Sequence, residues 1–355
     1  MLNIRETFPA LPIGIKNGIA ARVGDRIFIG LGSAGQQLFY LEDSKREQGW
    51  QLAPEFPGCR RNDAVCIAVA DADGLYVFSG AGQPEVTVTT QVLMDGYFFN
   101  AELWCWQAIQ TPPPVGLLGA SGCEWQQGQL AFWGGYNKET FDSFVAELSD
   151  VAPGSDAHRS LLEAFMSQPV HAYGWNQSII GFDCQTHQWR ELSINPYSAN
   201  CGASILHYQD NYLLIEGEIK PGLRSVTTKQ YRFCTNGEVE CNRFPSIIDK
   251  QALHEGLAGA FAGTNQRQLL VAGGAYFVGS QENYKKGQWY SHKGLIKHYS
   301  RDIWCFDGEG WSCVGLLPQG LAYGCSVMME NTLLLLGGEN SQGEATKQVY
   351  AIELE

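Results

Sequence analysis

Short apolar runs that end in small residues recur along the chain, at intervals of roughly 50 residues. Such runs, bounded by glycine, indicate buried β-strands. Where the following segment can be read, it holds an aromatic-rich strand and then a tryptophan-containing strand that ends near leucine or proline. The pattern predicts an all-β chain built from repeated four-strand units. The six runs are IFIGLG (27–32), LYVFSGAG (75–82), LAFWGG (130–135), YLLIEGE (212–218), LLVAGG (269–274) and LLLLGG (333–338).

This unit resembles the kelch repeat, in which each copy forms one four-stranded antiparallel blade around a central channel. Paired glycines let a strand turn where neighbouring blades crowd, and aromatic side chains fill the wedge between blades. Six runs predict a six-bladed kelch-type β-propeller that is a single domain over residues 1–355. The last unit has only three strands, so we expect residues 3–12 to add the fourth and close the ring.

One interval breaks the period, because 83 residues separate Gly134 from Gly217. The excess lies at 137–178, where apolar residues recur at helical spacing and Ser155 with Asp156 forms a typical helix start. We expect a small helical insertion after the inner strands of the third blade. It is either a decoration or a lid over a pocket.

Composition excludes several classes of partner. The net charge is −13 and no Lys/Arg-rich block occurs, so nucleic acid is not an expected partner. No apolar run approaches the ~18 residues of a membrane span. Eleven cysteines without a C-x-x-C pair, and an N-terminus without a signal-peptide pattern, favour a cytoplasmic location. The oligomeric state cannot be deduced from these features.

One apolar run, at 212–218, ends in two glutamates around a single glycine and is followed six residues later by an arginine. Glu218 closes the run at 212–218, and a Pro221-Gly222 turn should bring Arg224 back beside it. A partly desolvated carboxylate can act as a general base, and a guanidinium can bind a carboxylate ligand. A structural ion pair at the channel rim is the alternative. Glu216 should point the other way, because side chains alternate along a strand.

Other predicted loops at the same mouth carry polar and aromatic side chains that we expect to bind a ligand. They are Lys16, Arg61, Glu282, Asn283, Tyr284, His292 and Tyr323. The seven histidines show no metal-ligand spacing, and there is neither a phosphate-binding loop nor a G-x-S-x-G nucleophile motif. We therefore expect no metal and no cofactor.

Several stretches together resemble the bacterial N-acetylneuraminate epimerases, which are sialic acid mutarotases with a six-bladed kelch propeller. The likeness runs from about residue 8 to residue 352. By position, Glu218 matches the proton acceptor of that family and Arg224 its catalytic arginine. The matching stretches are IGLGSAG (29–35), EFPG (55–58) with Arg61, GEIKPGLR (217–224), GSQENY (279–284), SHKGL (291–295), YSRDIW (299–304) and AYG (322–324).

The resemblance implies a reaction that opens the pyranose ring of free sialic acid and recloses it on the other face. A base takes the proton of the anomeric hydroxyl, and an acid protonates the ring oxygen. The substrate carboxylate lies next to the anomeric carbon, so Arg224, with Arg61 or Lys16, would bind it. The candidates for returning the proton are Glu218, His292, Tyr323 and water.

Two departures from the family pattern affect this reading. The family has an arginine immediately before Ala-Tyr-Gly where this chain has Leu321, which implies different or weaker binding there. Known family members are exported to the periplasm, whereas this chain shows no signal.

The alternatives are a non-catalytic kelch scaffold that binds another protein and a carbohydrate-binding or sialidase-like propeller. The sialidase aspartate box, S-x-D-x-G-x-T-W, is absent, and the histidines are not clustered as a kelch-type copper oxidase requires. Which sialic acid variant is the substrate stays open.

Overall fold

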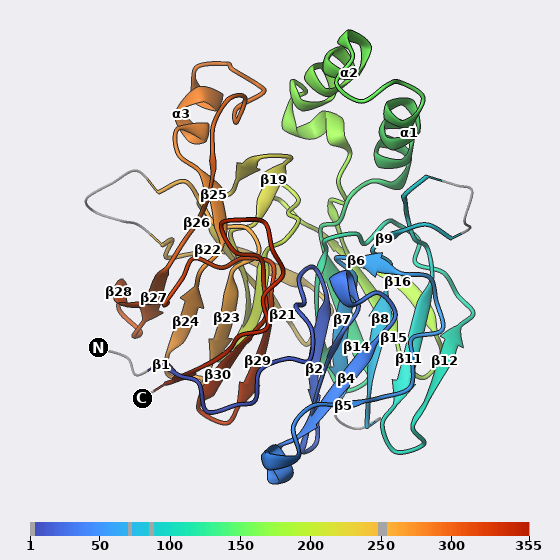
Figure 1. Cartoon of the computed structure of the whole chain (residues 1–355), viewed down its shortest axis with the longest axis vertical. Coiled ribbons are helices and arrows are strands. Elements are labelled where there is room, and N and C mark those ends of the chain that lie inside the picture. Colours follow the sequence, from blue (N-terminus) through green and yellow to red (C-terminus); the bar gives the residue numbers. More distant parts are fainter. Residues whose placement is uncertain (1–3, 70–72, 85–88, 248–253, 355) are drawn as a thin grey trace.

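The structure is a computed structural model that describes residues 4–69, 73–84, 89–247 and 254–354. Six four-stranded antiparallel sheets form the body of the structure (Figure 1). The first three sheets follow one another along the chain. They are β2 (Ile19–Val23), β3 (Arg26–Gly30), β4 (Leu38–Glu42) and β5 (Gln51–Leu52); β7 (Val65–Val69), β8 (Gly74–Phe78), β11 (Gly96–Asn100) and β12 (Cys105–Ile109); and β13 (Ser121–Gln126), β14 (Gln129–Trp133), β15 (Ser178–Asp183) and β16 (Gln188–Ile194).

The fourth to sixth sheets repeat the same order of strands, and the sixth takes its outer strand from the N-terminus. They are β17 (Ser204–Tyr208), β18 (Asn211–Ile215), β21 (Thr228–Phe233) and β22 (Val239–Phe244); β23 (Phe261–Thr264), β24 (Leu269–Ala272), β27 (Asp302–Phe306) and β28 (Trp311–Leu316); and β29 (Cys325–Met329), β30 (Thr332–Leu336), β31 (Val349–Glu353) and β1 (Ile4–Arg5). The predicted all-β class is confirmed.

The second strand of each sheet comes from one of the six apolar runs, and its burial explains the run. In β30 four consecutive leucines, 333–336, are fully buried. In β2 the pattern alternates, with Ile19, Ala21 and Val23 buried and the residues between them half-buried. Strands covered on both faces must be apolar at every position, because no face remains for polar side chains.

Hydrophobic clusters lie between consecutive sheets and hold them together. Phe28 of the first sheet packs with Leu75 and Phe99 of the second, and the corresponding clusters join each later pair. One further cluster joins the sixth sheet to the first, through Val327 and Ile29. The first strands also contact one another in cyclic order, from β2 to β7, β13, β17, β23, β29 and again β2.

Shorter elements gather at one end of the molecule, where the helices and β19 lie (Figure 1). Three short strands form one sheet, and two pairs of strands form hairpins. These are β6 (Arg61–Asn62), β9 (Ala81–Gly82) and β10 (Gln91–Val92); β19 (Glu218–Lys220) with β20 (Leu223–Arg224); and β25 (Ala275–Phe277) with β26 (Lys297–Tyr299). The α-helices among the described residues are α1 (Lys138–Ser149), α2 (Asp156–Met166) and α3 (Ser280–Lys285). No helix in the described part of the chain is both long and apolar enough to cross a membrane.

The two predicted helices of the insertion are present as α1 and α2. Asn137 caps α1 by accepting a hydrogen bond from the Thr140 amide, and Ser155 caps α2 in the same way from the His158 amide. The helices pack together through Phe144 and Phe165, whose ring centroids are 3.7 Å apart. The start predicted at Ser155 is therefore confirmed.

The N-terminal strand is shorter than predicted. Within the expected span of 3–12, only Ile4–Arg5 pairs with the sixth sheet, Ile4 opposite Ile352, and residue 3 lies outside the described residues. The rest of the segment leaves the sheet, but Phe8 and Leu11 are buried in the cluster between the sixth and first sheets. Prolines at positions 9 and 12 cannot donate ladder hydrogen bonds, which limits the strand.

Deleting residues 1–12 is expected to destabilise the fold and promote aggregation. The deletion removes β1, exposes the edge of β31, and removes the buried side chains of Phe8 and Leu11, each worth about 1.5–3 kcal/mol. Thermal unfolding and light scattering would measure the effect. A truncated chain that stays monomeric and as stable as the full chain would show that this segment is dispensable.

Candidate active site

Six residues, each two positions before the first strand of its sheet, form a closed ring of backbone hydrogen bonds. Each amide donates to the carbonyl oxygen of the residue from the preceding sheet, at 2.8–2.9 Å. All six have a positive φ, between 53° and 69°. The residues of this mouth ring are Asn17, Asp63, Gly119, Gly202, Gly259 and Tyr323. Glycine accommodates this left-handed backbone without strain, so the three positions that carry side chains stand out.

A cavity of about 240 Å³ lies over the mouth ring. The three side chains of the ring line it, together with Glu218 from the fourth sheet's loop and Tyr136 from the third's. Helix α1 adds Phe141 to the wall. The insertion therefore covers part of the cavity, which favours the lid over the decoration.

Glu218 and Arg224 face each other across the hairpin β19–β20. They are directly paired in its register, and Gly222 with a φ of 79° makes the turn between them. Glu218 Oε1 lies 3.1 Å from Arg224 Nη1. The predicted proximity of these two residues is confirmed, because both the pairing and the turn are local.

Arg224 is almost fully buried behind Glu218. Its Nε donates to the Ala275 carbonyl oxygen at 3.0 Å and its Nη2 to the Tyr323 hydroxyl at 3.2 Å. The guanidinium also lies over the Phe277 ring, 4.8 Å from its centroid. Nη1 faces Glu218 without an aligned hydrogen bond. This nitrogen is itself buried behind Glu218, and Arg224 does not line the cavity directly.

Glu216 points away from the cavity, as predicted, but not because of strand alternation, which places residues two apart on the same face. Positive φ angles at Glu216 and Gly217, 52° and 77°, interrupt the strand between the two carboxylates. Its buried carboxylate accepts hydrogen bonds from the Leu257 amide at 2.6 Å and lies 2.5 Å from His254 Nε2. Burial raises its pKa, against the effect of these partners. Glu216 thus has structural partners of its own and does not line the cavity.

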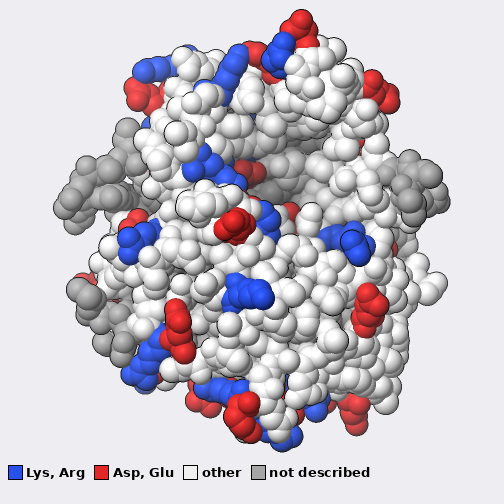
Figure 2. Space-filling model, viewed as in Figure 1, with Lys and Arg blue, Asp and Glu red and all other residues white. Residues whose placement is uncertain are grey.

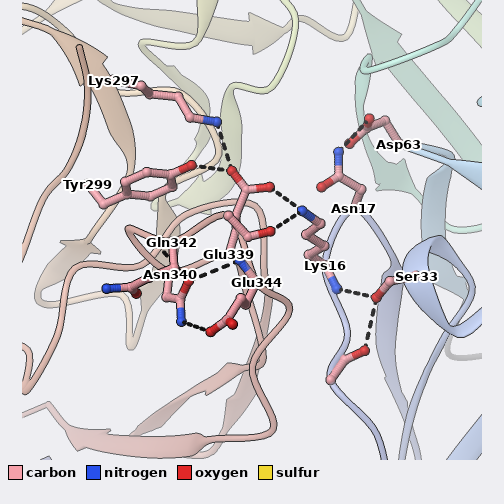
Figure 3. A network of polar contacts seen from close by, with 12 residues as sticks. Lys16, Asn17, Ser33, Asp63, Lys297, Tyr299, Glu339, Asn340, Gln342 and Glu344 are labelled. Carbon is pink, nitrogen blue, oxygen red and sulfur yellow. Dashed lines mark hydrogen bonds and ion pairs between the residues drawn. The ribbon is translucent and has the colours of Figure 1, made fainter.

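A charged cluster around Glu339 lies beside Asn17 of the mouth ring (Figure 3). Glu339 accepts from Lys16 at 2.5 Å, from Lys297 at 2.7 Å, and from the Tyr299 hydroxyl. Burial opposes ionisation, but these three donors lower the pKa of Glu339 to about 2. Two ammonium groups against one carboxylate leave one positive charge in excess. In the space-filling view, basic and acidic side chains lie together at the edge of a hollow (Figure 2).

The remaining predicted residues lie away from the cavity. Arg61 is buried and forms a two-pronged pair with Asp95, at 2.6 and 2.8 Å. Glu282 is exposed and pairs with Lys286, 2.6 Å away. Their neighbours on the same loop are also engaged in local contacts. Asn283 donates to the Ser291 carbonyl oxygen, and the Tyr284 ring packs against Trp289.

His292 is packed against the turn of the hairpin β19–β20. A Cβ atom added at Gly222 would lie only 1.7 Å from His292 Nδ1. Burial, with the nearby Arg224 and Lys220, lowers the pKa of His292 to about 4. His292 is therefore neutral near pH 7 and does not line the cavity. Among the candidates for returning a proton, Tyr323 does line it, and burial raises its pKa to about 12.

Leu321 lies in the apolar core between the fifth and sixth sheets and is fully buried. An arginine with its charge at this place would require a rearrangement of the core.

Sequence reasoning missed Asn17, Asp63, Tyr136 and Lys297. The only local signal was their closeness to motif residues, since Asp63 follows Arg61 and Tyr136 follows a glycine pair. In the described part of the chain, no three His, Cys, Asp or Glu residues are grouped to hold a metal ion.

Lys220, on the same hairpin β19–β20, connects the hairpin to the helical insertion. It is fully buried, and its Nζ donates to the carbonyl oxygens of Met166 at 3.0 Å, Gln168 at 2.6 Å and Trp289 at 2.6 Å. The first two belong to the insertion and the third to the loop of the fifth sheet. One ammonium group thereby connects the hairpin, the insertion and the loop of the fifth sheet.

A Lys220→Met variant is expected to lose stability and to loosen the insertion. It keeps the aliphatic stem but leaves three buried carbonyl oxygens without a donor, at about 1–3 kcal/mol each where water cannot replace it. Urea unfolding and hydrogen exchange of α2 would measure this. Lys293→Met is the matched control, because Lys293 pairs with Glu163 of α2 at the exposed surface and should matter little. Equal, small effects of both substitutions would contradict the anchoring role.

The chain is similar to known proteins over nearly its whole length. A family model described as N-acetylneuraminate epimerase matches residues 8–355. A kelch domain-containing protein of Vibrio cholerae is 41% identical over 351 residues, 98% of each chain. The N-acetylneuraminate epimerase of Brucella melitensis is 36% identical over 355 residues, 98% of this chain and 90% of that one. A solved structure titled "Structure of YjhT" matches with a TM-score of 0.92 at 32% identity, covering 98% of this chain and 97% of that chain. With a family match of this extent, the chain belongs to the N-acetylneuraminate epimerase family.

Proposed function

We propose that this enzyme interconverts the α- and β-anomers of free N-acetylneuraminate at the cavity over the mouth ring. The observation that carries the proposal is the Glu218 carboxylate in the cavity wall, ion-paired with a buried arginine. Family membership supplies the substrate class, and the cavity supplies a concave site with few polar groups. The reaction needs proton transfers alone, so protein side chains suffice for it.

In this proposal Glu218 takes the proton from the anomeric hydroxyl. Arg224 orients the carboxylate and neutralises its charge, which lets an anionic substrate approach a site that also holds a base. Its position supports this role, because the register of the hairpin and the Ala275 carbonyl hold the guanidinium in place. A base held in one orientation loses little entropy when the substrate binds.

The substrate carboxylate would be attracted by the excess positive charge of the Glu339 cluster, and it would contact Arg224 after a shift of the Glu218 side chain that now covers the guanidinium. Lys16 and Lys297 of this cluster are partly exposed, so they can contact a ligand without losing all their hydration. This local charge matters because the net charge of the protein, −13, repels anions at long range.

The same proposal includes a six-bladed propeller closed by the N-terminal segment. The six-membered mouth ring, the cyclic order of first-strand contacts and the pairing of β1 with β31 support it. A closed ring has no free inner edge, and it brings loops from all sheets to one mouth. That arrangement explains how residues from distant repeats come to share one cavity.

The direct test follows a freshly released α-anomer of N-acetylneuraminate by proton NMR. The protein should speed its conversion to the equilibrium mixture far beyond the spontaneous rate measured in the same buffer. Conversion at the spontaneous rate, at any protein concentration, would exclude the proposed activity. Other N- and O-acylated sialic acids in the same assay would define the substrate range.

A further inference from the structure

Asp63 occupies a backbone position that three of its five counterparts in the mouth ring leave to glycine. Its φ is 54°, and three members of the mouth ring that share this conformation are glycines. A left-handed backbone is unfavourable for a residue with a side chain, and such residues concentrate at functional sites. The Asp63 amide and carbonyl make the same ring hydrogen bonds that glycine makes elsewhere. The backbone therefore does not require aspartate, and its carboxyl group is the feature to explain.

The carboxyl group of Asp63 lines the same cavity as Glu218, but in a different electrostatic environment. Its Oδ2 accepts a hydrogen bond from Asn17 Nδ2 at 2.9 Å. Within the described residues it has no cationic partner within 4 Å, whereas Glu218 faces Arg224. The cavity thus holds one carboxyl group beside a guanidinium and one beside a neutral amide.

This environment makes Asp63 easier to protonate than an ordinary exposed aspartate. Burial raises its pKa to about 6, the Asn17 hydrogen bond opposes the rise, and the negative charges of Glu218 and Glu339 add to it. The other titratable groups around it are Tyr136, Cys201 and Cys325. Burial raises the pKa of each of these, so they carry no charge near neutral pH. The carboxylate of a bound substrate would favour the protonated form further.

We propose that Asp63 is the general acid of the reaction, the group that gives a proton to the ring oxygen while Glu218 accepts one from the anomeric hydroxyl. The inference rests on the proposed function and assigns its second proton. Two carboxyl groups in one site, one acting as base and the other as acid, are a recurrent solution for acid–base catalysis.

In each half of the reaction the protein takes one proton from the sugar and gives one to it. In ring opening, Glu218 takes the hydroxyl proton, the anomeric carbon forms a carbonyl, and its bond to the ring oxygen breaks. The electron pair stays on that oxygen, which takes the proton of Asp63. After the carbon turns its other face, the Asp63 carboxylate takes the proton back as the oxygen attacks. The protonated Glu218 then returns its proton to the former carbonyl oxygen, and both residues are restored.

Two substitutions test Asp63 from different sides. Asp63→Asn keeps an acceptor for Asn17 but has no acidic proton, and Asp63→Gly gives the ring the residue used at Gly119, Gly202 and Gly259. Both should lower the rate about 10²- to 10⁴-fold, the usual contribution of a general acid. Asp63→Gly should melt no lower than the wild type, because it removes the backbone strain. Asp73→Gly is the matched control, since Asp73 has a φ of 43° in an exposed turn and should keep full activity.

The pH dependence of the rate distinguishes a general acid from a residue with a structural role only. The acid must be protonated, so the wild-type rate should be highest below the pKa of Asp63 and fall as the pH rises above about 6. The Asp63 variants should lose the decline on the alkaline side, after subtraction of the spontaneous rate.

The outcomes separate this inference from the proposed function. A wild-type protein without mutarotase activity would refute the proposed function itself. An active wild type that Glu218→Gln inactivates, together with Asp63 variants of full rate and unchanged pH profile, would overturn the role of Asp63 alone. The proton donor would then be Tyr323, Tyr136 or water.

Discussion

A Glu218→Gln variant is expected to lose about 10²- to 10⁴-fold in mutarotation rate while it still binds sialic acid. Glutamine has the shape of glutamate and can still accept a hydrogen bond, but it cannot take the anomeric proton. The side chain lies in the cavity wall, so its shape matters for binding and its charge for catalysis. Rates come from proton NMR of the α-anomer, and affinity comes from calorimetry at equilibrium.

Glu216→Gln provides the matched control for this prediction. It makes the same change two residues away, on a carboxylate that contacts Leu257 and His254 and does not line the cavity. It should lower the stability, because the buried hydrogen bonds to Leu257 and His254 are weakened, and leave the rate constant of the folded enzyme nearly unchanged. Equal, small effects of both substitutions on the rate would favour a structural ion pair at Glu218 and a non-catalytic scaffold.

Arg224→Ala is expected to weaken both the fold and the binding of substrate. The guanidinium is buried, and its removal leaves Glu218 without its cation and the Ala275 carbonyl oxygen without its donor. Loss of one partner of a buried pair typically costs about 3–5 kcal/mol of stability. Loss of a charge-assisted contact with the substrate carboxylate would cost about 1.5–3 kcal/mol, roughly 10- to 150-fold in affinity.

Arg224→Lys tests how much of the stability depends on the positive charge and how much on the planar guanidinium. Lysine keeps the charge beside Glu218, but one ammonium group cannot reproduce the planar fork that reaches both Ala275 and Tyr323. Urea unfolding should therefore place it between the alanine variant and the wild type. Arg232→Ala is the control and should change neither property, because Arg232 in β21 of the fourth sheet pairs with Glu240 at the exposed surface. An Arg224→Ala protein as stable and as tightly binding as the wild type would contradict both roles.

The strands and the hairpin β19–β20 could be predicted because the sequence patterns that specify them are local. Each buried strand is a short apolar run, and the six-residue spacing of Glu218 and Arg224, with a Pro-Gly turn between them, allows one geometry. The start of α2 was equally local, since a serine cap acts on an amide three residues further along. In each case the partners lie within one strand, turn or helix end.

Site residues from separate repeats were predicted less well. Arg61 was expected to bind substrate because it is a charged loop residue, yet Asp95 and Phe56 surround it in the structure. Its neighbour Asp63 reaches the cavity instead, because the first strand of the second sheet begins two residues later and places that position in the mouth ring. Charge and chemistry were visible in the sequence, but the direction of each side chain was not.

The sequence by itself determined the all-β class, the repeated unit, the place of the insertion and the Glu218–Arg224 pair, all of which depend on neighbours within one unit. Only the tertiary structure decided which side chains share the cavity. Asn17 meets Asp63 across 46 residues, and Arg224 meets Tyr323 across 99. These contacts exist because six sheets pack side by side and each contributes one residue to a common ring of hydrogen bonds. No segment of the chain carries that information alone, since the position of each residue in the ring depends on the packing of all the others.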